Sequence, residues 1–404
     1  MLAAVDVLAP LVTWVLVALA GIAAVYWAVV IVRLVELLAT LPRVSDGLEE
    51  SEPEGGWPLV SIIVPAHNEE RVIEACATSM LLSDYPALEI LFVLDRCSDG
   101  TLDILRPIAA RDERLRIIEN HACPPDWAGK CHAAKVGAES ARGDYLLFTD
   151  ADVRFGPDLV RSSMGLLLRD RRGLLSLLPT LVTDAWYERI VQPVATMTLL
   201  RMYPINKVNR DERRRPFANG QFLLFDRSVY ERVGGHAATK NDLLEDIAFA
   251  RLVDSRGARV GLAVADDSLV VHMYPSFKAM QTGWRRIFIE ACKRRVSRLR
   301  QNAFRVACLG VLTPLVQIGA LAAAAGVGGA ALLAAVAVVA GGLLTQAVAL
   351  IMIYRSTRSP VSGAIFFPVG CAAVAHALWR GASDLAARRP VRWGGREYVL
   401  VPQD

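Results

Sequence analysis

The chain has 404 residues, 53% of them apolar, with a formal net charge of +4 at pH 7 and seven cysteines. The apolar residues are spread unevenly, which excludes a single water-soluble domain, and the small net charge gives no case for a nucleic-acid partner. Because no Cys-x-x-Cys pair occurs, we expect unpaired cysteines that serve as packing residues in a reducing compartment.

Residues 8–32 are predicted to form the first membrane span. They carry no charge and exceed the roughly 20 residues that a helix needs to cross a bilayer. No basic residue precedes Arg33, and the apolar stretch is far longer than that of a cleaved signal peptide. We therefore assign residues 1–33 to an uncleaved anchor, and the acidic residues 44–58, which contain glycine and proline, to a solvated linker.

Residues 59–284 have an ordinary globular composition, in which short apolar runs alternate with helical patterns. This alternation predicts an α/β domain with a mostly parallel sheet and helices on both faces. Ligands of such sheets bind beyond the carboxyl ends of the strands. Three predicted strands end in polar residues, at 65–69, at Asp95 and at 150–152. We expect these strand ends to face one crevice.

Asp150 and Asp152 follow the predicted strand "DYLLFTD". A single Asp-x-Asp is a weak signal, and a solvated loop is the ordinary alternative. Because this Asp-x-Asp is predicted to lie at the same sheet edge as two other polar strand ends, we favour a ligand site. Carboxylates suit Mg²⁺ or Mn²⁺, whose coordination is completed by substrate phosphates. The pair therefore predicts a cation that neutralises a departing pyrophosphate, and hence a nucleotide-activated donor.

Two basic segments occur in the second half of the chain. Residues 201–215 are predicted to form a mobile loop, with a solvated basic loop of no special purpose as the alternative. From 285 to 304, basic and apolar residues alternate at near-helical spacing. This pattern predicts a basic helix at an anionic membrane surface, although it also suits simple control of topology ahead of the next span.

Further membrane spans are predicted at 306–325 and 327–353, which are apolar and rich in small residues. Residues 361–379 are a weaker third candidate because they contain a proline and a histidine. We therefore assign two to three C-terminal transmembrane helices to residues 305–380 and a tail to residues 381–404.

Arginines flank these spans at positions 33 and 43, between 285 and 305, and at 355 and 358. The positive-inside rule therefore places the α/β domain in the cytoplasm. A third C-terminal span would put the basic tail outside, against the same rule. We therefore favour a re-entrant or interfacial segment at 361–379.

Six pieces of the chain occur in the order "VSIIVPAHNEE", "EILFVLDRCSDGT", "WAGKCHAAKVGAESARGDYLLFTDADVRF", "ANGQFLLFDRSVYERVGGH", "LLEDIAFA" and "QTGWRR". In these pieces, over nearly all of residues 58–300, the chain resembles the family-2 glycosyltransferases with the nucleotide-sugar-binding A-type fold. The anchor in front and the helices behind make it similar to bacterial inner-membrane enzymes that glycosylate hopanoid, carotenoid or ceramide-type lipids. The tail "VRWGGREY" resembles the closing Trp-x-Gly-Arg segment of that group.

The resemblance assigns the donor side. Ala66, Glu69 and Asp95 fall where the family contacts the uridine, and a carboxylate can accept hydrogen bonds from a base N–H or a ribose hydroxyl. For Glu69, an acid that complements a helix dipole is the alternative. Lys130 would meet a phosphate or anchor the nucleotide at a helix N-terminus, whereas a lone lysine is more often a surface residue. Asp150 would serve the ribose or the metal.

The resemblance also assigns the metal and the catalytic groups. Asp152 matches the direct ligand of Mg²⁺ or Mn²⁺ beside Asp150, and His272 is a candidate third ligand, although a histidine at a strand end is usually only hydrogen-bonded. Glu245 and Asp246 match the family's Glu-Asp motif, in which Asp246 is the general base for the acceptor hydroxyl. The alternative for this pair is an exposed acidic first turn of a helix.

Gln281, Trp284 and Arg285 stand where the family carries a Gln-x-x-Arg-Trp acceptor motif, but this chain reads Gln-Thr-Gly-Trp-Arg-Arg. The full motif marks processive polysaccharide synthases, so the departure favours the addition of one sugar. The resemblance thus implies an inverting, metal-dependent transfer from a UDP-sugar to a membrane lipid at the cytoplasmic face. A processive synthase and a catalytically silent nucleotide-sugar-binding scaffold are the alternatives, and the sugar, the lipid and the oligomeric state are not predicted.

Overall fold

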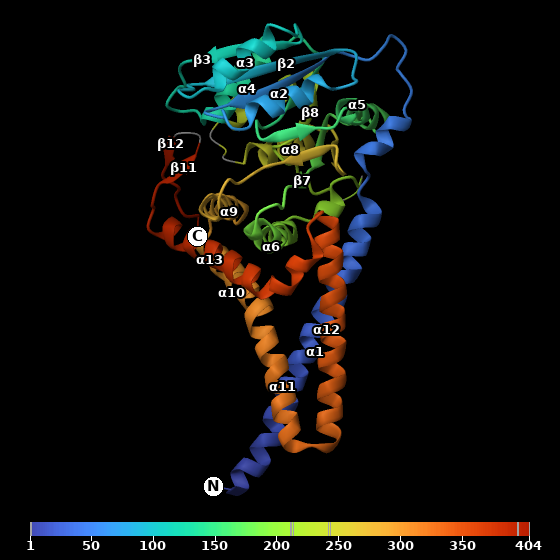
Figure 1. Cartoon of the computed structure of the whole chain (residues 1–404), viewed down its shortest axis with the longest axis vertical. Helices are drawn as coiled ribbons and strands as arrows, with labels where there is room; N and C mark the ends of the chain where they lie inside the picture. The colour runs from blue at the N-terminus through green and yellow to red at the C-terminus, as the bar shows by residue number, and fades with distance from the viewer. Residues whose placement is uncertain are drawn as a thin grey trace.

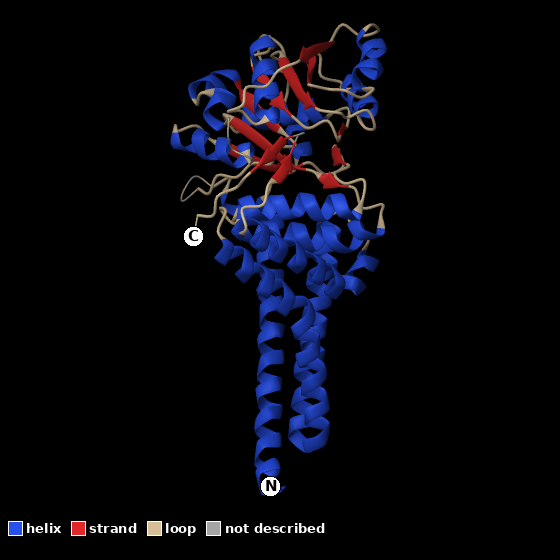
Figure 2. Cartoon of the chain, turned by 90° about the vertical axis from the view of Figure 1, so that its left-hand side faces the viewer, coloured by secondary structure: helices blue, strands red, loops and turns tan. Residues whose placement is uncertain are grey.

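The protein consists of an α/β domain, a layer of helices beneath it and a stalk of helices that extends from this layer (Figure 1). Figure 2 shows the same three levels after a quarter turn. The structure is a computed structural model that describes residues 2–403 except 211, 213, 241, 243, 394 and 395.

The central sheet has seven strands in the order β3-β2-β1-β4-β8-β6-β9. All neighbouring strands are parallel except β8, which runs antiparallel to β4 and β6. The mostly parallel sheet predicted from the sequence is therefore confirmed. The strands are β1 (Val60–Ala66), β2 (Leu88–Asp95), β3 (Leu115–Asn120), β4 (Tyr145–Phe148), β6 (Leu174–Leu178), β8 (Leu223–Asp226) and β9 (Val260–Val264).

Helices cover both faces of the sheet because successive strand residues point to opposite sides. Ile62 of β1 belongs to the core shared with α2 and α5, whereas Ile63 belongs to the core shared with α4 and α8. Every residue of β2 is buried, as expected for a strand covered on both faces. The helices of this domain are α2 (Ile73–Leu81), α3 (Thr101–Ala109), α4 (Gly129–Ser140), α5 (Leu159–Arg169), α7 (Arg227–Arg232) and α8 (Glu245–Ser255).

Two short ladders complete the strands. A three-stranded sheet has the order β5-β10-β7, and a hairpin of β11 and β12 lies near the C-terminus. The three-stranded sheet helps to position the predicted site because β5 begins directly after Asp152. The bounds are β5 (Val153–Phe155), β7 (Thr180–Leu181), β10 (Leu269–Val271), β11 (Val391–Trp393) and β12 (Arg396–Tyr398).

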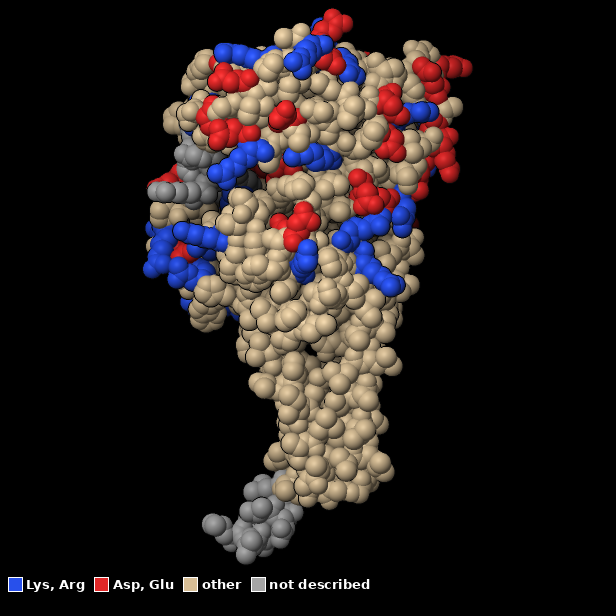
Figure 3. Space-filling view, in the orientation of Figure 1, with Lys and Arg blue, Asp and Glu red and all other residues tan. Residues whose placement is uncertain are grey.

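The helical layer and the stalk hold the apolar segments of the chain. Helices α6, α9, α10 and α13 share one apolar core beneath the α/β domain, while α1, α11 and α12 pack against one another in the stalk. Stalk side chains such as Leu315 and Ile318 are 59% and 65% exposed, and the stalk face in Figure 3 carries no charged side chain. The bounds are α1 (Leu2–Thr40), α6 (Trp186–Met202), α9 (Phe277–Ala291), α10 (Val296–Ala307), α11 (Thr313–Val327), α12 (Gly329–Ser356) and α13 (Phe367–Ala386).

Four helical segments of the described residues are long and apolar enough to cross a membrane: 9–40, 296–327, 329–356 and 361–386. The last of them contains α13, which packs against α6, α9 and α10 rather than along the stalk (Figure 1). The re-entrant or interfacial position of residues 361–379 stays a prediction. The domain boundaries themselves stay predictions.

The basic segment at 285–304 does not form the single helix that was predicted. Helix α9 ends at Ala291 and α10 begins at Val296, and between them Lys293 and Arg294 adopt left-handed backbone conformations, with φ of 55° and 51°. The turn lets α9 pack under the α/β domain while α10 leads into α11. The alternation of basic and apolar residues continues through the turn, so the sequence pattern could not reveal it.

Two segments predicted to be loose are partly packed. In the linker, Val44–Glu49 forms a 3₁₀ helix whose Gly47 is buried against α5. In the segment 201–215, Arg201 lies in α6, and Ile205 and Val208 are buried. Residues 211 and 213 of that segment lie outside the described residues.

Gly47→Ala should destabilise the protein by about 1–3 kcal/mol through overpacking. A Cβ at this position would lie 1.9 Å from the carbonyl oxygen of Ser162, a backbone atom that cannot rotate away. Thermal unfolding of the detergent-purified protein would measure the change. Glu49→Ala, an exposed change on the same 3₁₀ helix, is the control, and equal unfolding temperatures for the two variants would contradict the packed linker.

Candidate active site

The ammonium group of Lys130 joins two predicted site residues from distant segments. Its Nζ lies 2.7 Å from Oδ1 of Asp150 and 2.8 Å from Oε1 of Glu245. Burial alone would lower the pKa of Lys130, but the two carboxylates outweigh it, and the pKa lies well above its usual value. The lysine is therefore charged at neutral pH and is no ordinary surface residue. Its contact with a phosphate stays a prediction.

Asp246 lies beside this cluster in the first turn of α8. Its Oδ2 accepts a hydrogen bond from the backbone N–H of Gly220 at 2.8 Å, and its Oδ1 accepts one from the N–H of Ile247 at 2.7 Å. Burial, together with the charge of Glu245, raises the pKa of Asp246 to about 7. Glu245 itself is only 5% exposed, so the pair is not the exposed acidic turn that was the alternative.

Gly220 is a site residue to which the sequence assigns no role. A Cβ at this position would lie 3.4 Å from both the Lys130 Nζ and the Asp246 Oδ2. Gly220 therefore lies close to both the ammonium group of Lys130 and the carboxylate of Asp246. The signal was present, because Gly220 belongs to the matching piece "ANGQFLLFD", but that piece names no chemistry by itself.

The carboxylates of Glu69, Asp150 and Asp152 lie near one another at the carboxyl edge of the sheet. Burial and the charges of Asp150 and Glu69 raise the pKa of Asp152 to about 8. Burial and the charges of Asp150 and Asp99 raise the pKa of Glu69 to about 7. The Oδ1 atom of Asp152 is buried and has no hydrogen-bond partner among the described residues. An orphaned carboxylate oxygen in a concentration of negative charge fits a hard divalent cation.

His272 adjoins Asp152 through the backbone. Strands β5 and β10 pair antiparallel with Val153 opposite Val271, and the N–H of His272 donates to the carbonyl oxygen of Asp152 at 3.0 Å. The histidine side chain is exposed. Within the described residues, no group of three or more His, Cys, Asp or Glu side chains is arranged to hold a metal. The role of His272 as a third ligand stays a prediction.

The predicted uridine contacts lie at the ends of β1 and β2. Ala66 and Asp95 are both buried, and the Asp95 carboxylate is already engaged by Arg96 and by the amide of Asn120, whose Nδ2 donates to Oδ1 at 3.0 Å. Neither Arg96 nor Asn120 was predicted as a site residue. Side chains also join the two loops that follow these strands: Asn68 Oδ1 accepts from the N–H of Ser98, and Glu70 Oε2 accepts from the N–H of Gly100.

The predicted acceptor-side residues make contacts within the helical layer. The amide of Gln281 donates to the carbonyl oxygen of Ala373 at 3.3 Å, and Arg285 pairs with Asp384 at 2.9 Å. Trp284 is buried and stacks on Phe288. These contacts tie α9 to α13 and to the core of the layer, and the acceptor role of the three residues stays a prediction.

Arg286, the next residue of α9, is close enough to Asp150 and Glu245 for their charges to act on its pKa. Burial lowers its pKa, while Tyr274 and the carboxylates of Asp150 and Glu245 act in the opposite direction. Gly283 lets Tyr274 pack closely against α9, because a Cβ there would lie 2.4 Å from the ring of Tyr274. One residue along a helix turns the side chain by about 100°, so Arg285 and Arg286 serve different faces of α9.

A double-mutant cycle tests the ion pair. Lys130→Met should lower the free energy of unfolding by about 2 kcal/mol or more, because it leaves the buried Glu245 carboxylate without its cation. When Lys130→Met is combined with Glu245→Gln, the total loss should be smaller than the sum of the two single losses by about 1–3 kcal/mol. The control cycle uses Lys135→Met and Glu139→Gln, an exposed pair on α4, whose coupling should be about 0.5 kcal/mol or less. Equal couplings in thermal unfolding would contradict the central role of Lys130.

Curated relatives are glycosyltransferases that match part of the chain. The chain is 38% identical over 107 residues to EpsJ, an uncharacterized glycosyltransferase of Bacillus subtilis. The aligned region covers 26% of this chain and 28% of that protein. It is 24% identical over 228 residues to the 4,4'-diaponeurosporenoate glycosyltransferase of Staphylococcus haemolyticus, which covers 56% of this chain and 60% of that protein. These alignments thus span less than two thirds of either relative.

Two further similarities are to a curated enzyme and to a solved structure. The beta-monoglucosyldiacylglycerol synthase of Trichormus variabilis is 29% identical over 126 residues, which is 31% of this chain and 26% of that protein. Among solved structures, a mannosyltransferase of Pyrobaculum calidifontis, crystallised with GDP-Man and Mn²⁺, superposes with a TM-score of 0.47 at 20% identity, covering 89% of this chain and 99% of that one.

The family match covers almost the whole chain. Residues 13–403 match the family described as Glycosyl transferase family 21. The match includes the strand ends that carry Asp95, Asp150 and Asp152, the start of α8, and the C-terminal helices. The protein is therefore a glycosyltransferase, and it belongs to glycosyl transferase family 21.

Proposed function

We propose that this enzyme transfers one sugar from a UDP-sugar to a hydroxyl or carboxyl group of a membrane lipid, with inversion at the anomeric carbon and with the help of a divalent cation. The observation that carries the proposal is the contact of Lys130 with both Asp150 and Glu245. This one ammonium group contacts both a residue of the predicted donor side and a residue of the predicted catalytic pair, which supports a single site at the sheet edge.

The donor half is formed by the ends of β1, β2 and β4. Asp150 and Asp152 would hold Mg²⁺ or Mn²⁺, which, when bound, neutralises the charge of the pyrophosphate. The buried, unpaired Oδ1 of Asp152 supports this assignment. Glu69 and Ala66 would face the nucleoside, while Asp95 is held in place by Arg96 and Asn120. Arg286, whose charge reaches Asp150, would complement the phosphates from α9.

The acceptor half centres on Asp246. A single direct displacement at the anomeric carbon needs one base on the acceptor side and inverts the configuration. The two backbone N–H donors to the Asp246 carboxylate fix its orientation. Its pKa of about 7 suits a group that must take a proton near neutral pH. Glu245, paired with Lys130, would hold the first turn of α8 in position.

A lipid acceptor suits the position of the domain. Membrane-type helices precede and follow the α/β domain in the chain, and α6 and α9 lie between the sheet and the stalk (Figure 1). Two relatives have diaponeurosporenoate and monoglucosyldiacylglycerol in their names. A lipid held in the bilayer would therefore meet the crevice from the side of the helical layer. The arginines beside the spans favour the cytoplasmic face.

Metal-dependent turnover of a single nucleotide sugar is the expected result when the detergent-purified enzyme is given a panel of UDP- and GDP-sugars with and without Mn²⁺ or Mg²⁺. Asp152→Ala and Asp246→Asn should each lower turnover by about a hundredfold or more. Asp103→Ala, an exposed change on α3, should have no effect. Turnover that ignores chelation of the metal, or that survives both substitutions, would refute the assignment.

The transfer rate should rise between about pH 6 and pH 8 at saturating cation, because Asp246 accepts a proton only when it is ionised. Its raised pKa of about 7 places the midpoint near neutrality. Glu245→Gln removes the neighbouring negative charge, so ionised Asp246 becomes less costly and the midpoint should move to lower pH. Glu231→Gln, an exposed change on α7, should leave the midpoint in place. A midpoint unmoved by Glu245→Gln would contradict the assignment.

A further inference from the structure

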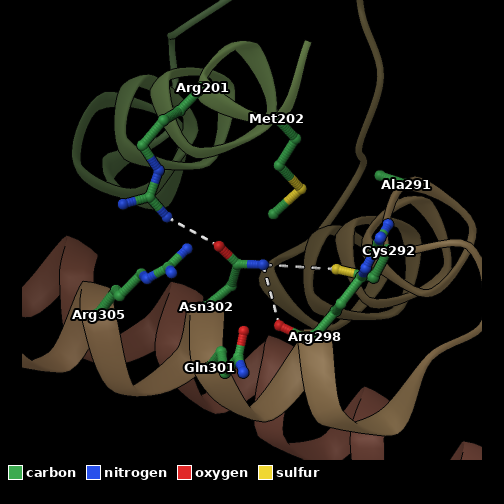
Figure 4. Close-up of a pocket in the computed structure, with 8 residues that line it drawn as sticks. All are labelled: Arg201, Met202, Ala291, Cys292, Arg298, Gln301, Asn302 and Arg305. Carbon is green, nitrogen blue, oxygen red and sulfur yellow. Dashed lines mark hydrogen bonds between the residues drawn. The ribbon is translucent and has the colours of Figure 1, made fainter. Parts of the chain in front are cut away.

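A pocket of about 280 Å³ lies between the C-terminal ends of α6 and α9 and the side of α10 (Figure 4). Arg201, Arg298 and Arg305 line it, together with the amides of Gln301 and Asn302. None of its lining residues belongs to the candidate active site. The pocket therefore calls for an explanation of its own.

Among the described residues, the pocket is lined by positive charges and by no acidic side chain. No Asp or Glu lines it, and none of the three arginines forms a salt bridge with a carboxylate of the described residues. The guanidinium groups of Arg201 and Arg305 point toward each other from α6 and α10 (Figure 4). Like charges that face each other repel unless an anion lies between them.

Hydrogen bonds fix the wall of the pocket. The Oδ1 of Asn302 accepts from Nη2 of Arg201 at 3.0 Å, and its Nδ2 donates to the carbonyl oxygen of Arg298 at 2.9 Å. Asn302 thus joins α6 to α10 and leaves most guanidinium N–H groups of the three arginines available to a ligand. Arginine presents its donors in a planar fork that matches the oxygens of a phosphate.

The position of the pocket points to a ligand in the bilayer. Arg305 is the last charged residue before residues 306–327, a stretch without charge whose helical length of about 33 Å matches the hydrocarbon thickness. Arg305 therefore lies at the level of the lipid headgroups. Beside it on α10, Phe304 is 69% exposed and would contact acyl chains. Arg201 also lies close to Tyr26 of the first span.

We propose that this arginine pocket binds the phosphate of an anionic membrane phospholipid. The bound lipid would neutralise Arg201, Arg298 and Arg305 together and would fasten α6, which lies under the α/β domain, to the helix that enters the membrane. The inference is independent of the proposed reaction, because it uses no residue of the active site. The catalytic domain would thus be held more firmly on an anionic bilayer than on a neutral one.

Binding of phosphatidylglycerol to the full-length protein in phosphatidylcholine nanodiscs tests the proposal, with the rise in unfolding temperature as the second readout. The pocket variant is Arg298→Gln with Arg305→Gln. The control is Arg295→Gln with Arg300→Gln, which removes the same charge from exposed positions near and on the same helix but not from the pocket. The pocket variant should bind the lipid about tenfold or more weakly, and the control should bind like the wild type.

Further arms separate the remaining explanations. Gln301→Glu places a carboxylate in the pocket wall, so it should weaken lipid binding while the protein stays folded in neutral nanodiscs. Equal losses in the pocket and control variants would mean general surface attraction and would overturn the proposal. Equal stabilisation by inorganic phosphate in neutral nanodiscs would overturn it as well, because the ligand would then be a free anion. Equal unfolding temperatures of the wild type in neutral and anionic nanodiscs would also overturn the proposal.

Discussion

The double contact of Lys130 is the interaction on which the site depends. Its ammonium group compensates the buried Glu245 and also binds Asp150, so the N-termini of α4 and α8 and the end of β4 meet at one point. Without this cation, the carboxylates at the sheet edge would repel one another, and burial would make each charge costly. One positive charge is therefore held among several negative ones at this edge of the sheet.

The sequence correctly predicts that the polar ends of β1, β2 and β4 lie at one edge of the sheet, because the direction of parallel strands decides this. Parallel strands bring their carboxyl ends to one edge, so residues after β1, β2 and β4 must lie near one another. The partners of Lys130 were not predictable in the same way. Glu245 lies in a distant helix, and an acidic first turn has an ordinary explanation in the helix dipole. Only the fold shows that Glu245 is buried against the lysine.

The helical layer was harder to predict for a different reason. The alternation of basic and apolar residues through 285–304 is the same whether the segment is one helix or two, so the turn at Lys293 and Arg294 left no signal. The rotation of α9 about its axis decides that Arg286, rather than Arg285, interacts with Asp150 and Glu245. Packing of α9 against α13 and Tyr274 fixes this rotation. The arginine pocket combines α6, α9 and α10, and no single segment reveals it.

Mass spectrometry of lipid extracts from cells that express the wild type or Asp246→Asn tests whether this enzyme adds one sugar to a membrane lipid. We expect a lipid that carries one additional sugar in the wild-type extract and is absent from the variant extract, while both proteins accumulate equally in the membrane. A sugar polymer in place of a singly glycosylated lipid, or the same lipid in both extracts, would contradict the account.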